Sequence, residues 1–376
     1  MAKKRLEIGI ATLLAIGLMC IALPGCGGGG GESSSGSPSA VPYKLPIGIT
    51  TDGTNLYIAD SDNHTIRMVA IGGSGAGTLL GGSIQGTPLS LSTAVTTVTT
   101  TASIVAGTTG SFGFQNGTGS AARFDSPSGI TTDGTNIYVA DTLNHAIRQV
   151  AIATGVVTTL AGTGSAGSQD SAPGVSPEFT LPAGITTAGF YLYVADTGNN
   201  SIRRVNKTSG FTDTIAGVVG SSGFNDSSVG ANARFNLPQG ITTDGTNLFV
   251  ADTNNHRVRK VSLGGTFAVS TLAGSGSIGF QDGPPLTAAE FNYPYGITSD
   301  GTNLFVADSN NNMIRKFRKD GTDNVVTVAG DALSAAGYLD NVVGTDARFN
   351  TPDGVTTNGK SLYVTDSANN KVREIQ

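Results

Sequence analysis

The sequence predicts an all-β fold made of six copies of one unit. Each copy has a proline, any residue, a glycine, a Thr-rich segment, a turn and a segment such as Phe-Val-Ala-Asp, with an arginine seven residues after the aspartate. The copies begin at Pro46, Pro127, Pro182, Pro238, Pro294 and Pro352. Glycine is abundant at 54 residues, and the copies lack the 3.6-residue apolar period of amphipathic helices. Short strands separated by turns are therefore expected throughout.

The copy that begins at Pro238 shows the expected elements in order. Residues 241–243 read as a short strand, Asp244-Gly245 as a hairpin turn, and 248–251 as a second strand whose two faces are both apolar. An Asp-Thr-Asn-Asn turn follows, and 258–261 and 269–273 read as a third and a fourth strand. Each copy thus predicts one four-stranded antiparallel sheet that must be covered on both sides.

Sheets with two apolar faces that recur along a chain are expected to stack around an axis as a β-propeller, here with six blades. Two irregularities bear on how the ring closes. The first copy carries an insertion at about residues 72–100, and the last ends at Gln376 before a fourth strand. The missing outer strand is predicted to come from residues 40–44 or from residues 89–100.

The N-terminus is predicted to be an export signal. Lys3, Lys4 and Arg5 precede an apolar stretch at 8–23, and Leu-Pro-Gly-Cys ends at Cys26. This resembles the lipobox of bacterial lipoproteins, so we expect a signal peptide at 1–25, lipidation of Cys26, a Gly/Ser tether at 26–41 and the propeller at 42–376. The alternative is an ordinary signal peptide or membrane anchor with an incidental cysteine. No acidic residue follows Cys26 directly, which favours the outer membrane if the source is Gram-negative.

Charge and cysteine content narrow the possible partners. The formal net charge is −5 and the basic residues are scattered, so nucleic acid is not an expected partner. Both cysteines lie in the N-terminal segment, and the six copies therefore contain no disulfide.

The motifs Pro-x-Gly-Ile, Leu-Phe-Val-Ala-Asp-Thr-x-Asn-His and Val-Arg resemble the NHL repeat. The resemblance covers most of the chain after Cys26, and it implies a propeller of the NHL type. Propellers similar to this one include a peptide-amidating lyase, RNA-binding domains and extracellular sensor domains. The resemblance therefore indicates a fold without indicating a function.

Residues that recur in every copy are expected to build the repeat. The recurring aspartates are predicted to close the turn after the second strand, and the recurring arginines to pair with a carboxylate or carbonyl between blades. The aspartates are Asp60, Asp141, Asp196, Asp252, Asp308 and Asp366, and the arginines are Arg67, Arg148, Arg203, Arg259, Arg315 and Arg373.

The three histidines are not expected to form a metal site. His64, His145 and His256 share one repeat position, where the other copies have asparagine, so they should lie apart around the ring. The inner strands are uncharged, which does not suit Ca²⁺, and no nucleophile motif is present. We expect no metal, no cofactor and no catalytic residue.

Residues that differ between copies are the candidates for function. The residue between proline and glycine varies and should surround the mouth of the central channel: Ile47, Ser128, Ala183, Gln239, Tyr295 and Asp353. With the neighbouring Tyr293, four of them, Ser128, Gln239, Tyr295 and Asp353, offer the mix of groups expected of a polar ligand pocket. The alternative is ordinary variation on an exposed surface.

The expected function is that of a membrane-anchored binding or scaffold module that recognises a protein, peptide or glycan outside the cytoplasm through one face of the propeller. One alternative is a lyase or hydrolase with its active site at the channel mouth. Another is a structural component of the cell envelope without a specific ligand.

Overall fold

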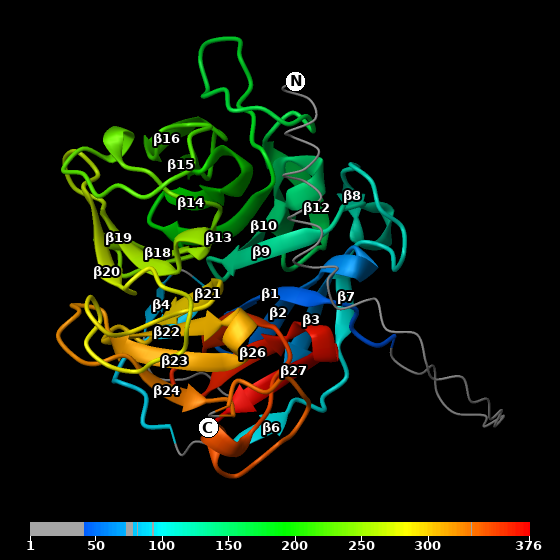
Figure 1. The fold of residues 1–376 in the computed structure, drawn as a ribbon. Helices are drawn as coiled ribbons and strands as arrows, with labels where there is room; N and C mark the ends of the chain where they lie inside the picture. Colours follow the sequence, from blue (N-terminus) through cyan, green and yellow to red (C-terminus); the bar gives the residue numbers. More distant parts are fainter. Residues whose placement is uncertain (1–40, 73–77, 81, 92–93, 332) are drawn as a thin grey trace, which may run out of the picture. The chain divides into compact units, whose positions relative to one another are not determined.

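The computed structural model describes residues 41–72, 78–80, 82–91, 94–331 and 333–376 (Figure 1). Residues 42–376 form one compact unit. The predicted signal peptide, Cys26 and the tether up to residue 40 lie outside the described residues. Within the described ranges, no helix combines the length and the apolar character needed to span a bilayer.

Six antiparallel sheets of at least four strands form the predicted propeller, and the innermost strand of each begins at the repeated proline. Blade 1 contains β1 (Pro46–Thr51), β2 (Asn55–Asp60), β3 (Thr65–Ala70) and β7 (Ser103–Ala106). Blade 2 contains β9 (Pro127–Thr132), β10 (Asn136–Asp141), β11 (Ala146–Ala151) and β12 (Val156–Ala161), with β8 (Gly117–Thr118) added at its outer edge. Blade 3 contains β13 (Pro182–Ala188), β14 (Tyr191–Asp196), β15 (Ser201–Asn206) and β16 (Thr212–Ala216).

The second half of the ring follows the same plan. Blade 4 contains β17 (Pro238–Thr243), β18 (Asn247–Asp252), β19 (Arg257–Ser262) and β20 (Val269–Ala273). Blade 5 contains β21 (Pro294–Ser299), β22 (Asn303–Asp308), β23 (Met313–Arg318) and β24 (Val326–Ala329). Blade 6 contains β25 (Pro352–Thr357), β26 (Leu362–Asp366), β27 (Lys371–Ile375) and β6 (Val95–Thr97).

Short 3₁₀ helices make the remaining regular turns. Six of them follow the second strand of a blade: η1 (Ser61–Asn63), η3 (Thr142–Asn144), η4 (Thr197–Asn199), η6 (Thr253–Asn255), η7 (Ser309–Asn311) and η9 (Ser367–Asn369). The other three lie in loops between blades: η2 (Gly119–Ala121), η5 (Gly230–Asn232) and η8 (Gly344–Asp346).

The innermost strands form a closed circle. Each contacts the innermost strand of the next blade, and β25 contacts β1. The repeated glycine permits this approach, because a Cβ atom at Gly240 would overlap the carbonyl oxygen of Tyr295 in the next blade. The glycine of every other copy meets its neighbour in the same way. This explains why Pro-x-Gly recurs six times.

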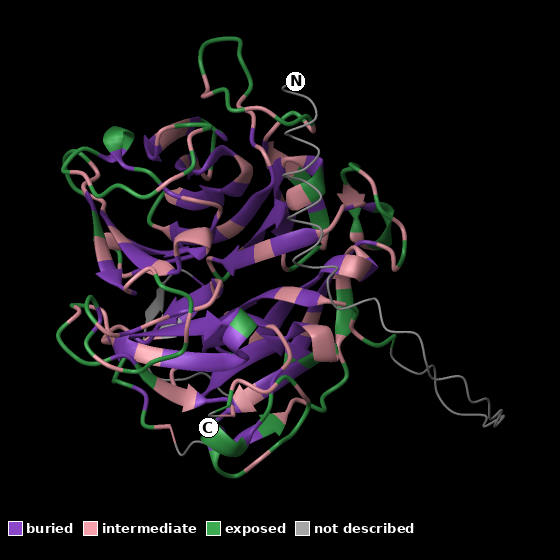
Figure 2. Ribbon diagram, in the orientation of Figure 1, coloured by how far each residue is buried: buried purple, intermediate pink, exposed green. Residues whose placement is uncertain are grey.

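The two apolar faces of each blade pack into two different core clusters. On β18, Leu248 and Val250 join a cluster shared with blade 3, whereas Phe249 joins one shared with blade 5. The buried residues consequently run through the sheets from blade to blade, while exposed residues gather in the loops (Figure 2). Because successive side chains of a strand point to opposite faces, each sheet packs against both of its neighbours.

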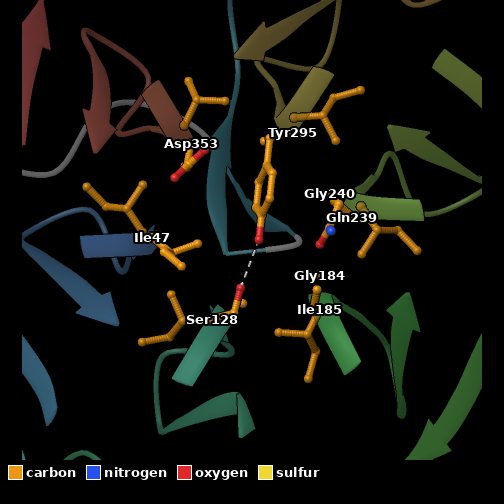
Figure 3. A pocket seen from close by; sticks show the side chains of 18 residues that line it. Ile47, Ser128, Gly184, Ile185, Gln239, Gly240, Tyr295 and Asp353 are labelled. Carbon is orange, nitrogen blue, oxygen red and sulfur yellow. Dashed lines mark hydrogen bonds between the residues drawn. The ribbon is translucent and has the colours of Figure 1, made fainter. Parts of the chain in front are cut away.

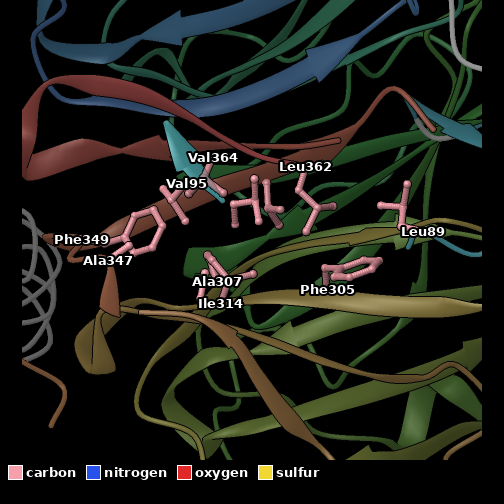
Figure 4. Close-up of a cluster of buried hydrophobic side chains, with 12 residues drawn as sticks. Leu89, Val95, Phe305, Ala307, Ile314, Ala347, Phe349, Leu362 and Val364 are labelled. Atoms are coloured by element: carbon pink, nitrogen blue, oxygen red, sulfur yellow. The ribbon is translucent and has the colours of Figure 1, made fainter. Parts of the chain in front are cut away.

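The ring is closed by the insertion of the first copy. β6 pairs with β27, so Val95 lies opposite Ile375 and supplies the outer strand that the last copy lacks. Val95 and Leu89 belong to the core between blades 5 and 6, together with Phe305 and Phe349 (Figure 4). Of the two predicted closures, the one by residues 89–100 is confirmed. The one by residues 40–44 is wrong, because residues 41–44 form no strand.

The insertion also fills one end of the central channel. A hairpin of β4 (Thr78–Leu80) and β5 (Ser83–Gln85) contacts the inner strands of blades 1, 5 and 6. The carbonyl oxygen of Gly82 accepts a hydrogen bond from the Thr50 hydroxyl at 2.7 Å, and the Ser83 hydroxyl lies 2.6 Å from that of Thr298. Gln85 bonds the carbonyl of Ser299 where β21 ends. The hairpin therefore enters from the end of the channel opposite the Pro-x-Gly residues.

Candidate functional site at the channel mouth

The histidines connect neighbouring blades through a hydrogen bond to the backbone. Nδ1 of His145 accepts a hydrogen bond at 3.1 Å from the backbone N–H of Leu181, the residue before the proline of the next blade. The Asn200 side-chain oxygen accepts the same bond from Leu237, and Asn370 accepts it from Leu45 across the junction of blades 6 and 1. Histidine and asparagine interchange here because Nδ1 and Oδ1 are equivalent acceptors, and both residue types tolerate the left-handed backbone of this position.

A second bond between blades uses the hydroxyl residue after each repeated aspartate. Its Oγ donates to the carbonyl of the repeated proline in the next blade. The pairs are Ser61 with Pro127, Thr142 with Pro182, Thr197 with Pro238, Thr253 with Pro294, Ser309 with Pro352 and Ser367 with Pro46. All six junctions of the ring carry this bond.

The repeated aspartate and arginine form a buried ion pair within each blade. In blade 4, Asp252 and Arg259 lie 2.6 Å apart with no exposed surface. Arg259 also donates to the carbonyls of Asn225 and Arg234 and to the Asp226 carboxylate, all in the loop that arrives from blade 3. The arginine therefore holds the incoming loop to its own blade. The prediction that it pairs between blades holds for the loop bonds, whereas the ion pair with the repeated aspartate lies within one blade.

The six residues between proline and glycine converge where their strands begin. They line a cavity of about 60 Å³ at the channel mouth, together with the glycines and apolar residues that follow them (Figure 3). Of the predicted ligand-binding residues, Ser128, Gln239, Tyr295 and Asp353 all line this cavity. The structure thus brings together side chains from blades 2, 4, 5 and 6.

Tyr293 does not join this group. It is absent from the lining of the cavity, and its ring packs edge-on against His256, with the ring centres 4.9 Å apart. Its backbone N–H bonds His256 Nδ1, and its φ of 53° lies in the left-handed region. The residue before each repeated proline belongs to the junction between blades, which is why its side chain turns away from the mouth.

Tyr295 spans the mouth. Its hydroxyl lies 3.4 Å from that of Ser128, which belongs to a blade on the other side of the ring (Figure 3). Gln239 is 8% exposed, and its side-chain oxygen Oε1 has no hydrogen-bond partner among the described residues. A buried acceptor without a partner costs free energy, so this atom is available to a ligand.

Asp353 is the only ionisable carboxyl group in the cavity lining. It is 7% exposed and forms no ion pair within the described part of the chain. Burial, aided by the nearby Asp366 carboxylate, raises the pKa of Asp353 to about 7, although the hydroxyls of Ser367 and Ser309 act to lower it. Burial also raises the pKa of Tyr295, and the neighbouring Asp353 carboxyl adds to this effect. A buried carboxyl group without a cation is unusual in a structural position and common at functional sites.

A larger hollow of about 510 Å³ lies at the outer edge of blades 2 and 3. Its lining includes Thr159, Ser171, Val175 and the exposed Phe211, and none of its lining residues is ionisable. The residues of this hollow offer few groups for specific chemistry, and we place the candidate site at the mouth instead. The ranges that the structure describes contain no group of three His, Cys, Asp or Glu side chains arranged to hold a metal ion.

Sequence reasoning located the mouth but missed the hairpin behind it. The local signal for the hairpin was the Gly-Gly pair at 81–82, which favours a two-residue turn. Its destination inside the channel had no local signal. Because the hairpin occupies the far end, a ligand reaches the residues that line the mouth from the Pro-x-Gly side.

The fold and the site define a six-bladed β-propeller with one accessible polar mouth. Residues 235–261, which span the inner three strands of blade 4, match the family model described as NHL repeat. Together with the architecture, this match supports a propeller of the NHL type.

The curated relatives of this chain include two proteins that are 28% identical to it. One is Protein SUPPRESSOR OF QUENCHING 1, chloroplastic, of Arabidopsis thaliana, aligned over 77% of this chain and 26% of the other. The other is NHL repeat-containing protein 2 of Gallus gallus, aligned over 89% of this chain and 46% of the other. The chain therefore spans less than half the length of these relatives.

Solved structures show the same fold. An auxiliary nutrient binding protein from Bacteroides thetaiotaomicron superposes with a TM-score of 0.60 at 14% identity, over 89% of this chain and 69% of the other. At this identity the likeness establishes the architecture alone.

Proposed function

We propose that this chain is a binding module whose propeller presents the mouth face to a protein, peptide or glycan outside the cytoplasm. The observation that carries the proposal is that the repeated residues and the varied residues have different roles. The repeated Asp, Arg, Asn, His and hydroxyl side chains are all engaged in bonds within or between blades. The residues that differ between copies converge on one cavity, where Gln239 Oε1 has no hydrogen-bond partner and Asp353 no ion pair among the described residues.

Two further points support this proposal. The hairpin at the far end leaves the mouth as the entrance to the channel lining, so a ligand of the channel approaches from the Pro-x-Gly side. A propeller of the same fold carries the name of an auxiliary nutrient binding protein. The proposal also includes export and a lipid anchor at Cys26, which rest on the N-terminal sequence.

The alternative of a lyase or hydrolase at the mouth has one observation in its favour. Asp353 has a pKa of about 7, which suits a general acid or base near neutral pH. The cavity lining, however, contains no His, Cys or Lys that would act with it. A binding role therefore fits the available groups better than catalysis does.

The proposed function is tested by photo-cross-linking in cells. A photoreactive amino acid replaces Ile47 at the mouth, and in a control strain it replaces Phe190, which is 78% exposed in the turn between β13 and β14 on the opposite face. We expect a recurrent cross-linked partner from position 47 and none from position 190. Equal capture from both positions, or none from either, would favour an envelope component without a specific ligand. Labelling with a fatty-acid analogue that is lost in Cys26→Ser tests the anchor.

A further inference from the structure

The size of the mouth cavity limits what enters it. A volume of about 60 Å³ is several times the roughly 10–15 Å³ that one water molecule needs. It is far below the roughly 300–1,000 Å³ of pockets that enclose a whole drug-sized ligand. The cavity therefore admits one terminal group of a ligand, and the rest of that ligand stays at the rim.

The electrostatic character of the cavity selects the charge of that group. Asp353 is the only lining residue that carries a formal charge near neutral pH, and no lysine, arginine or histidine lines the cavity. Gln239 adds the unpartnered Oε1 acceptor, and the hydroxyls of Ser128 and Tyr295 can accept as well. A group that enters with a positive charge and several N–H donors would satisfy these acceptors together.

The walls of the cavity select the stem that carries the group. Below the six varied positions the lining is aliphatic, with Ile49, Ile130, Ile185, Ile241 and Ile297 from five blades and Val355 from the sixth. An aromatic ring lies in the centre of the mouth, and such rings attract cations at their faces (Figure 3). A short alkyl chain ending in a compact cation matches this lining. One carboxylate is too few for a divalent metal ion, which takes six or more oxygen ligands, but balances a single positive charge.

We propose that the mouth binds a primary ammonium group at the end of an alkyl chain, with Asp353 as its counter-ion and Gln239, Ser128 and Tyr295 as further acceptors. This inference rests on the proposed function and names the chemistry that the mouth recognises. A free alkylamine and the lysine side chain of a partner protein both carry this group.

The test measures binding of small probes to the full-length protein in detergent by calorimetry. The probes are n-butylamine, its neutral analogue 1-butanol, and Nα-acetyl-lysine methylamide with its Nε-acetylated form. We expect saturable binding of butylamine with a dissociation constant on the order of millimolar, and binding of butanol weaker by about tenfold or more. Equal affinity for butylamine and butanol would overturn the inference.

Matched variants assign the binding to the mouth. Asp353→Asn keeps the shape of the side chain and removes its charge, and it should weaken amine binding by about tenfold or more. Asp346→Asn makes the same change at an exposed aspartate that pairs with no cation among the described residues, and it should leave binding unchanged. Gln239→Leu removes the acceptor and should weaken binding by about threefold to tenfold. If the folded Asp353→Asn protein binds butylamine as wild type does, the inference is wrong.

The results distinguish a lysine side chain from a free amine as the source of the ammonium group. They also distinguish failure of the ammonium inference from failure of the proposed binding function. Tighter binding of the lysine derivative than of butylamine assigns the group to a protein side chain, and the reverse order assigns it to a free amine. If no amine binds but position 47 still cross-links a partner, the ammonium inference fails while the binding function stands. If amines bind and no partner is captured, the site stands and the proposed function as a recognition module fails.

Discussion

At the scale of single residues, one position shows how a repeat tolerates different amino acids. His64, His145 and His256 accept the same bond that asparagine accepts in the other three blades. For a histidine this role requires an unprotonated Nδ1 atom. The chemistry of the acceptor is thus kept, while the ring or amide that carries it varies.

We predict that His145→Asn leaves the melting temperature nearly unchanged, whereas His145→Ala lowers stability by about 1–3 kcal/mol because the Leu181 N–H loses its partner. Thermal unfolding followed by circular dichroism at pH 7.5 distinguishes the two. Equal destabilisation by both substitutions would show that the ring itself, and not the acceptor, matters.

We expect the same histidines to make the stability of the protein depend on pH. Burial lowers the pKa of His145 and His256, so the unfolded chain binds more protons than the folded chain below the ordinary value of about 6.5. Their stabilising contribution is complete above pH about 6.5 and is lost as the pH falls through the lowered folded pKa. A double variant, His145→Asn with His256→Asn, should therefore lose less stability than wild type between pH 7 and pH 5.5.

We expect Asp353 to change the stability with pH in the direction opposite to that of the histidines. Its folded pKa of about 7 lies above the ordinary 3.8, so the folded state disfavours the charged form. The contribution of Asp353 to the stability of the unliganded protein is greatest below pH about 4 and is lost as the pH rises through about 7, with Asp366 adding repulsion and Ser309 and Ser367 partly offsetting it.

Asp353→Asn should accordingly raise the melting temperature at pH 8, with a gain that shrinks towards pH 5. The control Asp346→Asn should show no such trend. If the melting temperature at pH 8 is unchanged or lower in Asp353→Asn, the surroundings of Asp353 already stabilise its carboxylate, and a ligand cation is not needed to do so.

At the scale of elements, strand β6 decides whether the ring closes. Val95 is 1% exposed, pairs with Ile375 and packs into the core between blades 5 and 6. A charge at this position would be buried without a partner.

We predict that Val95→Asp destabilises the protein by about 3 kcal/mol or more, as expected for an unpaired buried charge. The control is Val326→Asp on the outer strand of blade 5, where the valine is 40% exposed and the charge remains in water. Similar melting temperatures for the two variants would show that β6 does not hold the ring.

At the scale of the whole molecule, we expect closure of the ring to make the six blades unfold as one cooperative unit. β27 lies between β26 and β6, and hydroxyl and amide bonds join blade 6 to blade 1. An open array of repeats would lose a terminal strand at small local cost, since each repeat there contacts only its neighbours.

Deletion of residues 371–376 should therefore abolish the cooperative thermal transition and expose all blades to limited proteolysis. Ile375→Val, which keeps the strand, should cost only about 1 kcal/mol. A truncated protein that keeps a sharp transition would show that the blades are stable without closure.

Much of the fold followed from local patterns. The strands predicted at 241–243, 248–251, 258–261 and 269–273 lie within β17, β18, β19 and β20, although β17 begins three residues earlier, at Pro238. The prediction works because alternation and turn residues act within one hairpin. Comparison of the copies also located Ser128, Gln239, Tyr295 and Asp353 at one mouth. It failed for Tyr293, whose orientation depends on a left-handed backbone and on a histidine of the preceding blade.

The sequence by itself determined the number of blades, the two-faced strands and the distinction between shared and varied positions, because each of these is a matter of period and of neighbours along the chain. Only the tertiary structure decided which segment closes the ring and that the same insertion occupies the far end of the channel. It also decided that, among the described residues, Asp353 has no ion pair and Gln239 Oε1 has no hydrogen-bond partner. Those features depend on contacts between residues hundreds of positions apart. The closed ring, and not any local pattern, determines which groups are buried and which of them remain without partners.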